Sequence, residues 1–343
     1  MPCRDIPLKD FMNKLNYLIF LLLIFGAISV QTVNAQAVRD PALAALIEAE
    51  KLGDAFKAAQ IKIAANPDDL DAYTALIFSV GPSQVNKDSS EAVLKLLEDC
   101  AGRLNAAVCH WGVGNIAGLI AIEGGMIKGL RMAPKIRSSF EKALQIDPLL
   151  WLARSGLVQY FLLAPSVAGG SVSKAMETAS AESVRQPETT RLLKAAVHLH
   201  EEQWVNAEDQ LTGLAALPTK SMRDDAFVTW IGLGFGWLKG KQTTRAKTVF
   251  ERLQKERPAS AFPVYGLGRV QTESGQLDEA INLLQRSAGL KDAEQLPVDY
   301  RLGIAYQLKG DKIAAKSALN KALQGKMMSS SARKDAQKRI DEL

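Results

Sequence analysis

The spacing of apolar residues between Thr229 and Pro258 limits the possible folds of this chain more than any other feature. The pattern consists of Trp230, Leu233, Gly234, Trp237, Ala246, Phe250, Leu253 and Pro258. Its first four members recur at helical intervals, and Phe250 and Leu253 do the same on a second helix. Pro258 ends that helix because it has no backbone N–H to donate. The stretch therefore predicts two packed helices, which need neighbours to cover their apolar faces.

The same pattern returns along the C-terminal part of the chain. Gly234 and Gly268 are 34 residues apart, and Gly268 and Gly303 are 35 apart. This period and these residues resemble the tetratricopeptide repeat, a helix–turn–helix unit of about 34 residues. The resemblance implies an all-α fold, a right-handed superhelical solenoid of about eight tetratricopeptide-like hairpins.

The expected organisation has three parts. Residues 1–35 are a signal peptide, residues 36–325 form the solenoid, and residues 326–343 are a charged capping helix and tail. The solenoid divides into degenerate units with an extended helix (36–148), weak units with a Gly-Gly loop insertion (149–222) and regular repeats (223–325).

The N-terminal segment predicts export. Leu15 to Val30 is apolar apart from two residues, Lys14 precedes it, and Ala35 or Ala37 completes a cleavage site. The alternative is an uncleaved membrane anchor, although the run is short for a span of about 20 residues. We expect an exported protein, periplasmic, that keeps no membrane span after cleavage.

Two adjacent units depart from the regular spacing. Between Gly114 and Ile136 there are 22 residues, where the repeat at Gly234 has 12 between matching positions. The sequence predicts that the extra residues lengthen the first helix, with a break at Gly124-Gly125. The second insertion, Ala164 to Ser171, adds a turn rich in small residues, and insertions at such turns often build binding faces.

Composition and motifs argue against several classes of function. The net charge is +5, and the charges are interspersed without a basic stripe that carries aromatic residues, so no nucleic-acid partner is expected. Gly169-Gly170-Ser171 lacks the Lys-Ser/Thr of a phosphate loop, and His198 and His200 do not have zinc-ligand spacing. No catalytic serine or cysteine pattern occurs. We therefore expect no enzyme activity, no cofactor and no metal.

The two cysteines beyond the signal segment predict a disulfide. An exported protein oxidises its cysteines, and the repeat register places Cys100 at the end of one helix and Cys109 at the start of the next. Asn105 lies in the turn between them. The alternative is a pair of buried free thiols.

The resemblance also indicates which residues line the inner surface, because positions 5, 9 and 12 of each first helix face inward in this family. The resulting apolar groove comprises Leu157, Tyr160, Phe161, Leu192, Leu199, Ile231, Phe235, Leu238 and Tyr265. The Lys/Asn/Arg clamp with which some members hold acidic chaperone tails is absent from these positions. The groove would hold a protein or peptide with an apolar segment or a lipid-like molecule, or the chain would bury it itself.

The function expected from these features is a non-enzymatic tetratricopeptide scaffold for protein–protein interaction in the bacterial envelope. The alternative is a periplasmic binding protein for an apolar small molecule or lipid, such as a component of a transport system.

Overall fold

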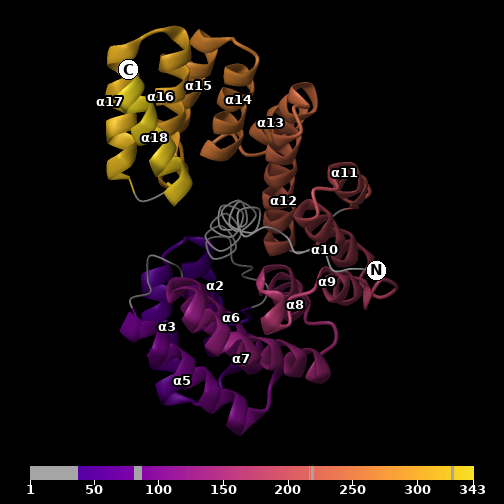
Figure 1. The fold of residues 1–343 in the computed structure, drawn as a ribbon. Helices are drawn as coiled ribbons and strands as arrows, with labels where there is room; N and C mark the ends of the chain where they lie inside the picture. Colours follow the sequence, from indigo (N-terminus) through magenta and orange to yellow (C-terminus); the bar gives the residue numbers. More distant parts are fainter. Residues whose placement is uncertain (1–37, 81–86, 216, 218–219, 326–327) are drawn as a thin grey trace. The chain divides into compact units, whose positions relative to one another are not determined.

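The computed structural model describes residues 38–80, 87–215, 217, 220–325 and 328–343. The expected signal peptide, with Lys14 and Ala35, lies outside these residues. Seventeen α-helices and two short 3-10 helices follow one another in the described residues, which contain no strand (Figure 1). The predicted all-α solenoid is therefore confirmed, whereas its right-handed superhelical twist stays a prediction.

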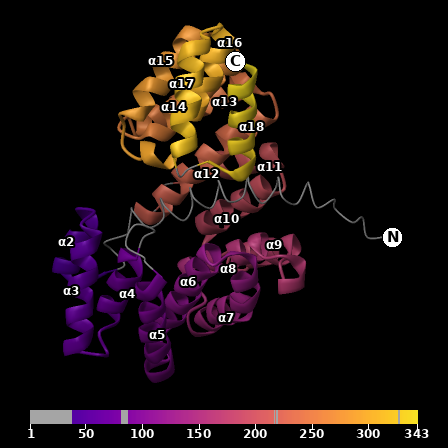
Figure 2. The same cartoon turned by 60° about the vertical axis from the view of Figure 1, so that its left-hand side comes forward.

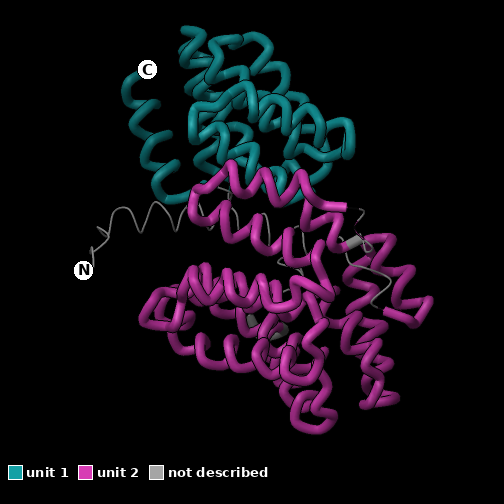
Figure 3. The backbone as a smooth tube through the Cα atoms, turned by 90° about the vertical axis from the view of Figure 1, so that its right-hand side faces the viewer, with its two compact units in different colours: residues 1–24, 227–343 teal, residues 25–226 magenta. Residues whose placement is uncertain are grey.

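The chain falls into two compact units, which within the described residues are 38–226 and 227–343 (Figure 3). The border lies inside α12 (Lys220–Lys239), close to the start of the regular repeats expected at residue 223.

The unit 38–226 contains ten complete helices among its described residues. They are α2 (Pro41–Glu48), α3 (Leu52–Ala65), α4 (Leu70–Ser79), α5 (Lys87–Leu104), α6 (Ala107–Glu123), α7 (Gly125–Ile146), α8 (Trp151–Leu163), α9 (Val172–Ser180), α10 (Pro187–His200) and α11 (Trp204–Thr212). The 3-10 helix η1 (Ser166–Ala168) lies between α8 and α9. Most helices contact the next helix in sequence, α4 contacts α6, and α8 also contacts α6 and α10, as expected when hairpins stack in one direction.

The unit 227–343 holds the regular repeats. Its helices after α12 are α13 (Thr243–Glu256), α14 (Ala261–Glu273), α15 (Leu277–Ala288), α16 (Val298–Lys309), α17 (Lys312–Gln324) and α18 (Ser330–Glu342), with the 3-10 helix η2 (Ala293–Gln295) before α16. Helix α13 ends two residues before Pro258, as the sequence predicts.

The small residues of the pattern allow close helix packing. A Cβ atom added at Gly234 of α12 or at Gly266 of α14 would lie only 2.7 or 2.5 Å from the ring of Phe250. The ring of Phe250, on α13, therefore fills the space that two glycines leave open, and it is fully buried. This contact explains why the repeat requires glycine and a large apolar residue at a fixed spacing.

The same arrangement recurs around Phe140 of α7. Its ring lies against Gly114 of α6 and Gly156 of α8, where an added Cβ would come within 2.7 and 2.5 Å. Phe140 precedes Gly156 by 16 residues, as Phe250 precedes Gly266. The unit 38–226 is thus built on the same contact, although its sequence pattern is weaker.

The insertion before Phe140 is distributed differently from the prediction. Helix α6 has 17 residues, four more than α14, whereas α7 has 22, eight more than α13. The first helix thus takes fewer of the extra residues than predicted, whereas the predicted break at Gly124-Gly125 is present. Gly125 has a φ of 72°, which favours glycine and ends α6.

Helix α18 covers the end of the last hairpin. Ser329 caps its first turn by accepting a hydrogen bond from the Ala332 N–H at 3.1 Å. Its Ala336 is buried in a small core with Tyr300 and Leu319, and α18 lies along α17 (Figure 2). A polar helix at this position protects the apolar end of the stack, which is the role expected of a capping element.

Candidate binding site

Three residues of the expected groove lie on α8, and the structure buries all of them. Leu157, Tyr160 and Phe161 belong to the hydrophobic core of the unit 38–226. The Tyr160 hydroxyl donates a hydrogen bond to the carbonyl oxygen of Ala168, and burial raises the pKa of that hydroxyl. The Phe161 ring packs edge-on against Tyr160, with the centroids 5.6 Å apart. These side chains thus hold the inserted turn in place.

The inserted turn is closed by its own backbone. The N–H groups of Gly169, Gly170 and Ser171 donate to the carbonyl oxygens of Ser166, Pro165 and Phe161 at 2.8 to 3.1 Å. A Cβ at Gly170 would lie 1.7 Å from the Ala164 carbonyl oxygen, so only glycine fits there. The three N–H groups are therefore engaged within the protein and do not form a phosphate cradle.

The remaining six residues of the expected groove are also buried. Leu192 and Leu199 lie on α10, Ile231, Phe235 and Leu238 on α12, and Tyr265 on α14. Phe235 is 2% exposed, and its ring centroid lies 5.0 Å from that of Phe250 and 6.0 Å from that of Tyr265. Five of the nine belong to the unit 38–226 and four to the unit 227–343. A single binding surface formed by all nine stays a prediction.

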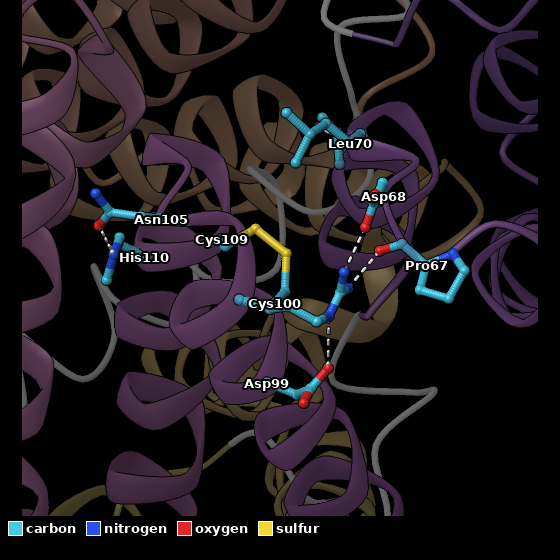
Figure 4. The surroundings of a disulfide bond; sticks show 10 residues. Pro67, Asp68, Leu70, Asp99, Cys100, Asn105, Cys109 and His110 are labelled. Carbon is cyan, nitrogen blue, oxygen red and sulfur yellow. Dashed lines mark hydrogen bonds and ion pairs between the residues drawn. A yellow bond between two sulfur atoms is a disulfide. The ribbon is translucent and has the colours of Figure 1, made fainter.

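A disulfide joins Cys100 of α5 to Cys109 of α6 (Figure 4). The two Cα atoms are 5.7 Å apart, and Asn105, in the turn between the helices, has a φ of 46°. Arg103, three residues after Cys100 on α5, forms ion pairs with Asp68 and Asp99 and donates to the Pro67 carbonyl oxygen at 2.6 Å. The bond and these contacts fix α5 against α6 and the start of α4.

A shallow polar depression of about 400 Å³ lies on the same unit. Its lining residues are His110 of α6 and Ser138, Ser139, Glu141, Lys142 and Gln145 of α7. His110 Nε2–H donates to Asn105 Oδ1 at 3.2 Å, and burial, with a smaller effect of Lys142, lowers the pKa of the imidazole. The composition of this depression suits water and polar groups rather than an apolar ligand.

Sequence reasoning missed an exposed apolar cluster at the turn between α6 and α7. Its members are Ile122, Met126, Ile127 and Leu130, of which Met126 and Ile127 are 73% and 74% exposed. They lie on the hairpin of α6 and α7, which the insertion lengthens. The apolar run of residues around Gly124-Gly125 was the signal that could have identified it.

A second missed residue is Arg154, the one charged side chain of α8. It is buried, and none of its three guanidinium nitrogens has a hydrogen-bond partner among the described residues. The signal in the sequence was a lone arginine in the run from Trp151 to Leu163.

Within the described residues, no group of His, Cys, Asp or Glu is arranged to hold a metal ion. Nor does any described helix have both the length and the apolar character that crossing a bilayer requires.

The fold resembles several solved structures. A chain of the Cut9–Hcn1 hetero-tetramer of the APC/C matches with a TM-score of 0.53 and 17% identity over 84% of this chain. A monomeric mutant of IFIT1 with Gppp-AAAA matches with a TM-score of 0.55 and 11% identity over 84% of this chain and 67% of that one. This protein spans about half, 52%, of the matched Cut9–Hcn1 chain. No family model and no curated sequence matches it.

A tetratricopeptide repeat protein from Parabacteroides merdae also matches, with a TM-score of 0.49 and 11% identity, over 79% of this chain and 99% of that one. The repeat period, the glycine–phenylalanine contacts and the likeness to Cut9–Hcn1 agree with one another. The chain therefore has the fold of a tetratricopeptide-repeat solenoid. At these identities the likeness defines the fold alone.

Proposed function

We propose that this protein is an exported scaffold without enzymatic activity that binds another polypeptide in the bacterial envelope. The observation that carries the proposal is the stacking of helical hairpins in each unit. Stacked hairpins present a long surface that is already ordered, so a partner binds at a low cost in conformational entropy. The Cut9–Hcn1 structure, whose fold this chain shares, is itself a complex of different proteins.

The fold alone does not select the partner, since the IFIT1 structure of the same fold holds Gppp-AAAA. The interspersed charges and the modest net charge of +5 argue against a nucleic-acid ligand for this protein. Export and the periplasmic setting rest on the segment Leu15 to Val30 and on the small residues Ala35 and Ala37.

An apolar small molecule or lipid is the second candidate, favoured by the apolar character of the nine expected groove residues. Those side chains are buried against other parts of the protein, as the packing of Phe235 on Phe250 and Tyr265 illustrates. The depression described above is polar. We therefore place a polypeptide partner first, and this choice does not depend on an open groove.

Native mass spectrometry of the protein purified from its own host tests both candidates. We expect the protein to retain a polypeptide, and an adduct with the mass of a lipid would instead support the second candidate. The same spectra give the mature mass, for which we expect a chain that begins at Gln36 or Val38. A mass that includes Leu15 to Val30 would contradict cleavage and support a membrane anchor.

A further inference from the structure

Arg154 presents an unusual combination of burial and unused hydrogen-bonding capacity. It lies in the first turn of α8, it is 1% exposed, and its Nε, Nη1 and Nη2 atoms have no hydrogen-bond partner in the described part of the chain. A guanidinium remains protonated in proteins and carries five N–H donors. Burying a guanidinium without an acceptor is costly. An anion that accepts its hydrogen bonds would therefore bind there favourably.

The charges around Arg154 do not neutralise it. Glu182, in the turn between α9 and α10, interacts with it electrostatically, but both Glu182 oxygens already accept hydrogen bonds from Arg185 at 2.7 Å. Burial lowers the pKa of the Arg154 guanidinium, Glu182 opposes this effect, and Arg185 adds to it. Two cations and one carboxylate leave this region with an excess positive charge.

Two further polar atoms near the start of α10 also lack hydrogen-bond partners among the residues that the structure describes. They are Oε1 of Gln186, the residue before α10, and Oγ1 of Thr190 in its first turn. The Gln186 Nε2 group donates to the Leu149 carbonyl oxygen at 2.8 Å, which ties the start of α10 to the start of α8. Helices α8 and α10 are in contact, and Figure 1 shows them beside α9.

These unpartnered atoms belong to residues at the starts of two helices in contact, α8 and α10. They are the three guanidinium nitrogens of Arg154, Gln186 Oε1 and Thr190 Oγ1, all without a hydrogen-bond partner among the described residues. Together they offer donors for an oxyanion, one carbonyl acceptor for an N–H group and one hydroxyl. A carboxylate next to an amide N–H has this combination, and it occurs at the C-terminus of a polypeptide and at its acidic side chains.

We propose that the starts of α8 and α10 part to admit a carboxylate of the partner polypeptide, which Arg154, with Gln186 and Thr190, then binds. The inference rests on the proposed function and names the chemistry that the partner supplies. Arg154 is not one of the inner-surface positions that the resemblance indicates, so the site comes from its burial and its unpartnered atoms. The carboxylate takes the guanidinium N–H groups bidentately, and the adjacent amide N–H donates to Gln186 Oε1.

The test uses small probes and the full mature protein. N-acetylglycine has both the carboxylate and the N–H, acetate lacks the N–H, N-acetylglycinamide lacks the carboxylate, and inorganic phosphate is an oxyanion of another class. Isothermal titration at constant ionic strength gives the affinity of each. We expect N-acetylglycine to bind more tightly than acetate or phosphate, and N-acetylglycinamide not to bind. Equal or tighter binding of phosphate would overturn the proposal, as would no binding of N-acetylglycine.

Variants of Arg154 separate a binding role from a structural one. We expect Arg154→Met to weaken N-acetylglycine binding at least about tenfold, and Arg154→Lys to restore only part of it, because lysine lacks the planar fork. The control Arg131→Met removes an exposed arginine of α7 and should leave the affinity unchanged. Unchanged affinity in Arg154→Met would contradict the proposal.

The stability of the variants without a probe gives a second, independent reading. Methionine replaces an unpaired buried charge with an apolar side chain of similar length, so the thermal midpoint of Arg154→Met should be unchanged or higher. A large fall in this midpoint would mean that the guanidinium has partners within the protein, which would overturn the inference. A polypeptide retained in native mass spectrometry together with unchanged binding in Arg154→Met would leave the proposed function intact and reject this site alone.

Discussion

Phe140 and Phe250 have the same role in the two units, yet only one of them is evident from the sequence. Each ring lies between two glycines of the flanking first helices. From Gly234 to Phe250 there are 16 residues, whereas from Gly114 to Phe140 there are 26. The comparison teaches that the packing contact is maintained when the spacing is not, because the ten extra residues extend α6 and α7 away from the layer that contains the ring.

The largest expected effect concerns buried positions of the regular unit. Phe235 is expected to line the groove, and Leu253 is a core residue of α13, but the structure buries both. We expect Phe235→Asp and Leu253→Asp each to lower the free energy of unfolding by about 4 kcal/mol or more, because each buries an unpaired carboxylate. Chemical denaturation with circular dichroism measures both values.

The control is Ile127→Asp, at the exposed turn between α6 and α7, which should change stability by less than about 0.5 kcal/mol. The comparison would be broken if Phe235→Asp cost less than Leu253→Asp by about 2 kcal/mol or more, which is roughly half the expected effect. The side chain of Phe235 would then face an opening that a partner can fill.

The next prediction compares the two units directly. Phe250→Ala and Phe140→Ala each remove a buried ring between two glycines and should each cost about 3 to 5 kcal/mol. Thermal unfolding followed by calorimetry measures the loss. Similar values would support the equivalence of the two layers. A cost below about 1 kcal/mol at Phe140 alone would contradict it, since it would mean that the longer α7 relaxes to fill the space.

Much of the fold could be predicted because the repeat pattern records contacts within one hairpin. Gly234 and Phe250 meet across a single turn, so the spacing of a small and a large residue in the sequence indicates their contact. The unit at Phe140 lacks the regular spacing, and its ring was not recognised. The division of the insertion between α6 and α7 depends on the backbone at Gly125, which adopts a positive φ. Counting residues per helical turn does not predict how many of the extra residues each helix takes.

The candidate site was less accessible to sequence reasoning. Apolar residues such as Leu157 and Phe235 have the same pattern whether they line an open groove or a closed core, and only the structure distinguishes these cases. The burial of Arg154 depends on how α8 and α10 meet, which no local pattern encodes. The pairing of Cys100 with Cys109 was predictable, because nine residues and one turn separate them.

The disulfide distinguishes the unit 38–226 from the regular repeats, which hold their hairpins without a covalent bond. Closing a loop of this length stabilises the protein by about 2 to 3 kcal/mol in the entropy model. We expect the double variant Cys100→Ser with Cys109→Ser to lose about this amount in denaturant unfolding. Thiol labelling of unreduced, unfolded mature protein should detect no free cysteine, and two labelled thiols per chain would contradict the bond.

The smallest expected effect is a pH dependence that arises from His110, beside the disulfide. Burial, with a smaller contribution from Lys142, holds the pKa of its imidazole below the ordinary value, so the folded protein favours the neutral ring. Below the ordinary pKa of about 6.5 the unfolded chain binds a proton that the folded chain does not, and stability falls. This stability is fully present above that pH and is lost as the pH decreases through the lower, folded-state value.

The measurement is a series of denaturant unfolding curves between pH 7.5 and pH 5 for the native protein and for His110→Gln. Glutamine keeps a donor for Asn105 Oδ1 but does not titrate, so the variant should lose less stability over this range than the native protein. His198→Gln is the matched control, because that histidine lies on α10 of the same unit and donates from Nδ1–H to Gln203 Oε1 at 2.8 Å. An equal pH slope in the native protein and in His110→Gln would show that the ring at position 110 is as free to take up a proton in the folded state as in the unfolded one.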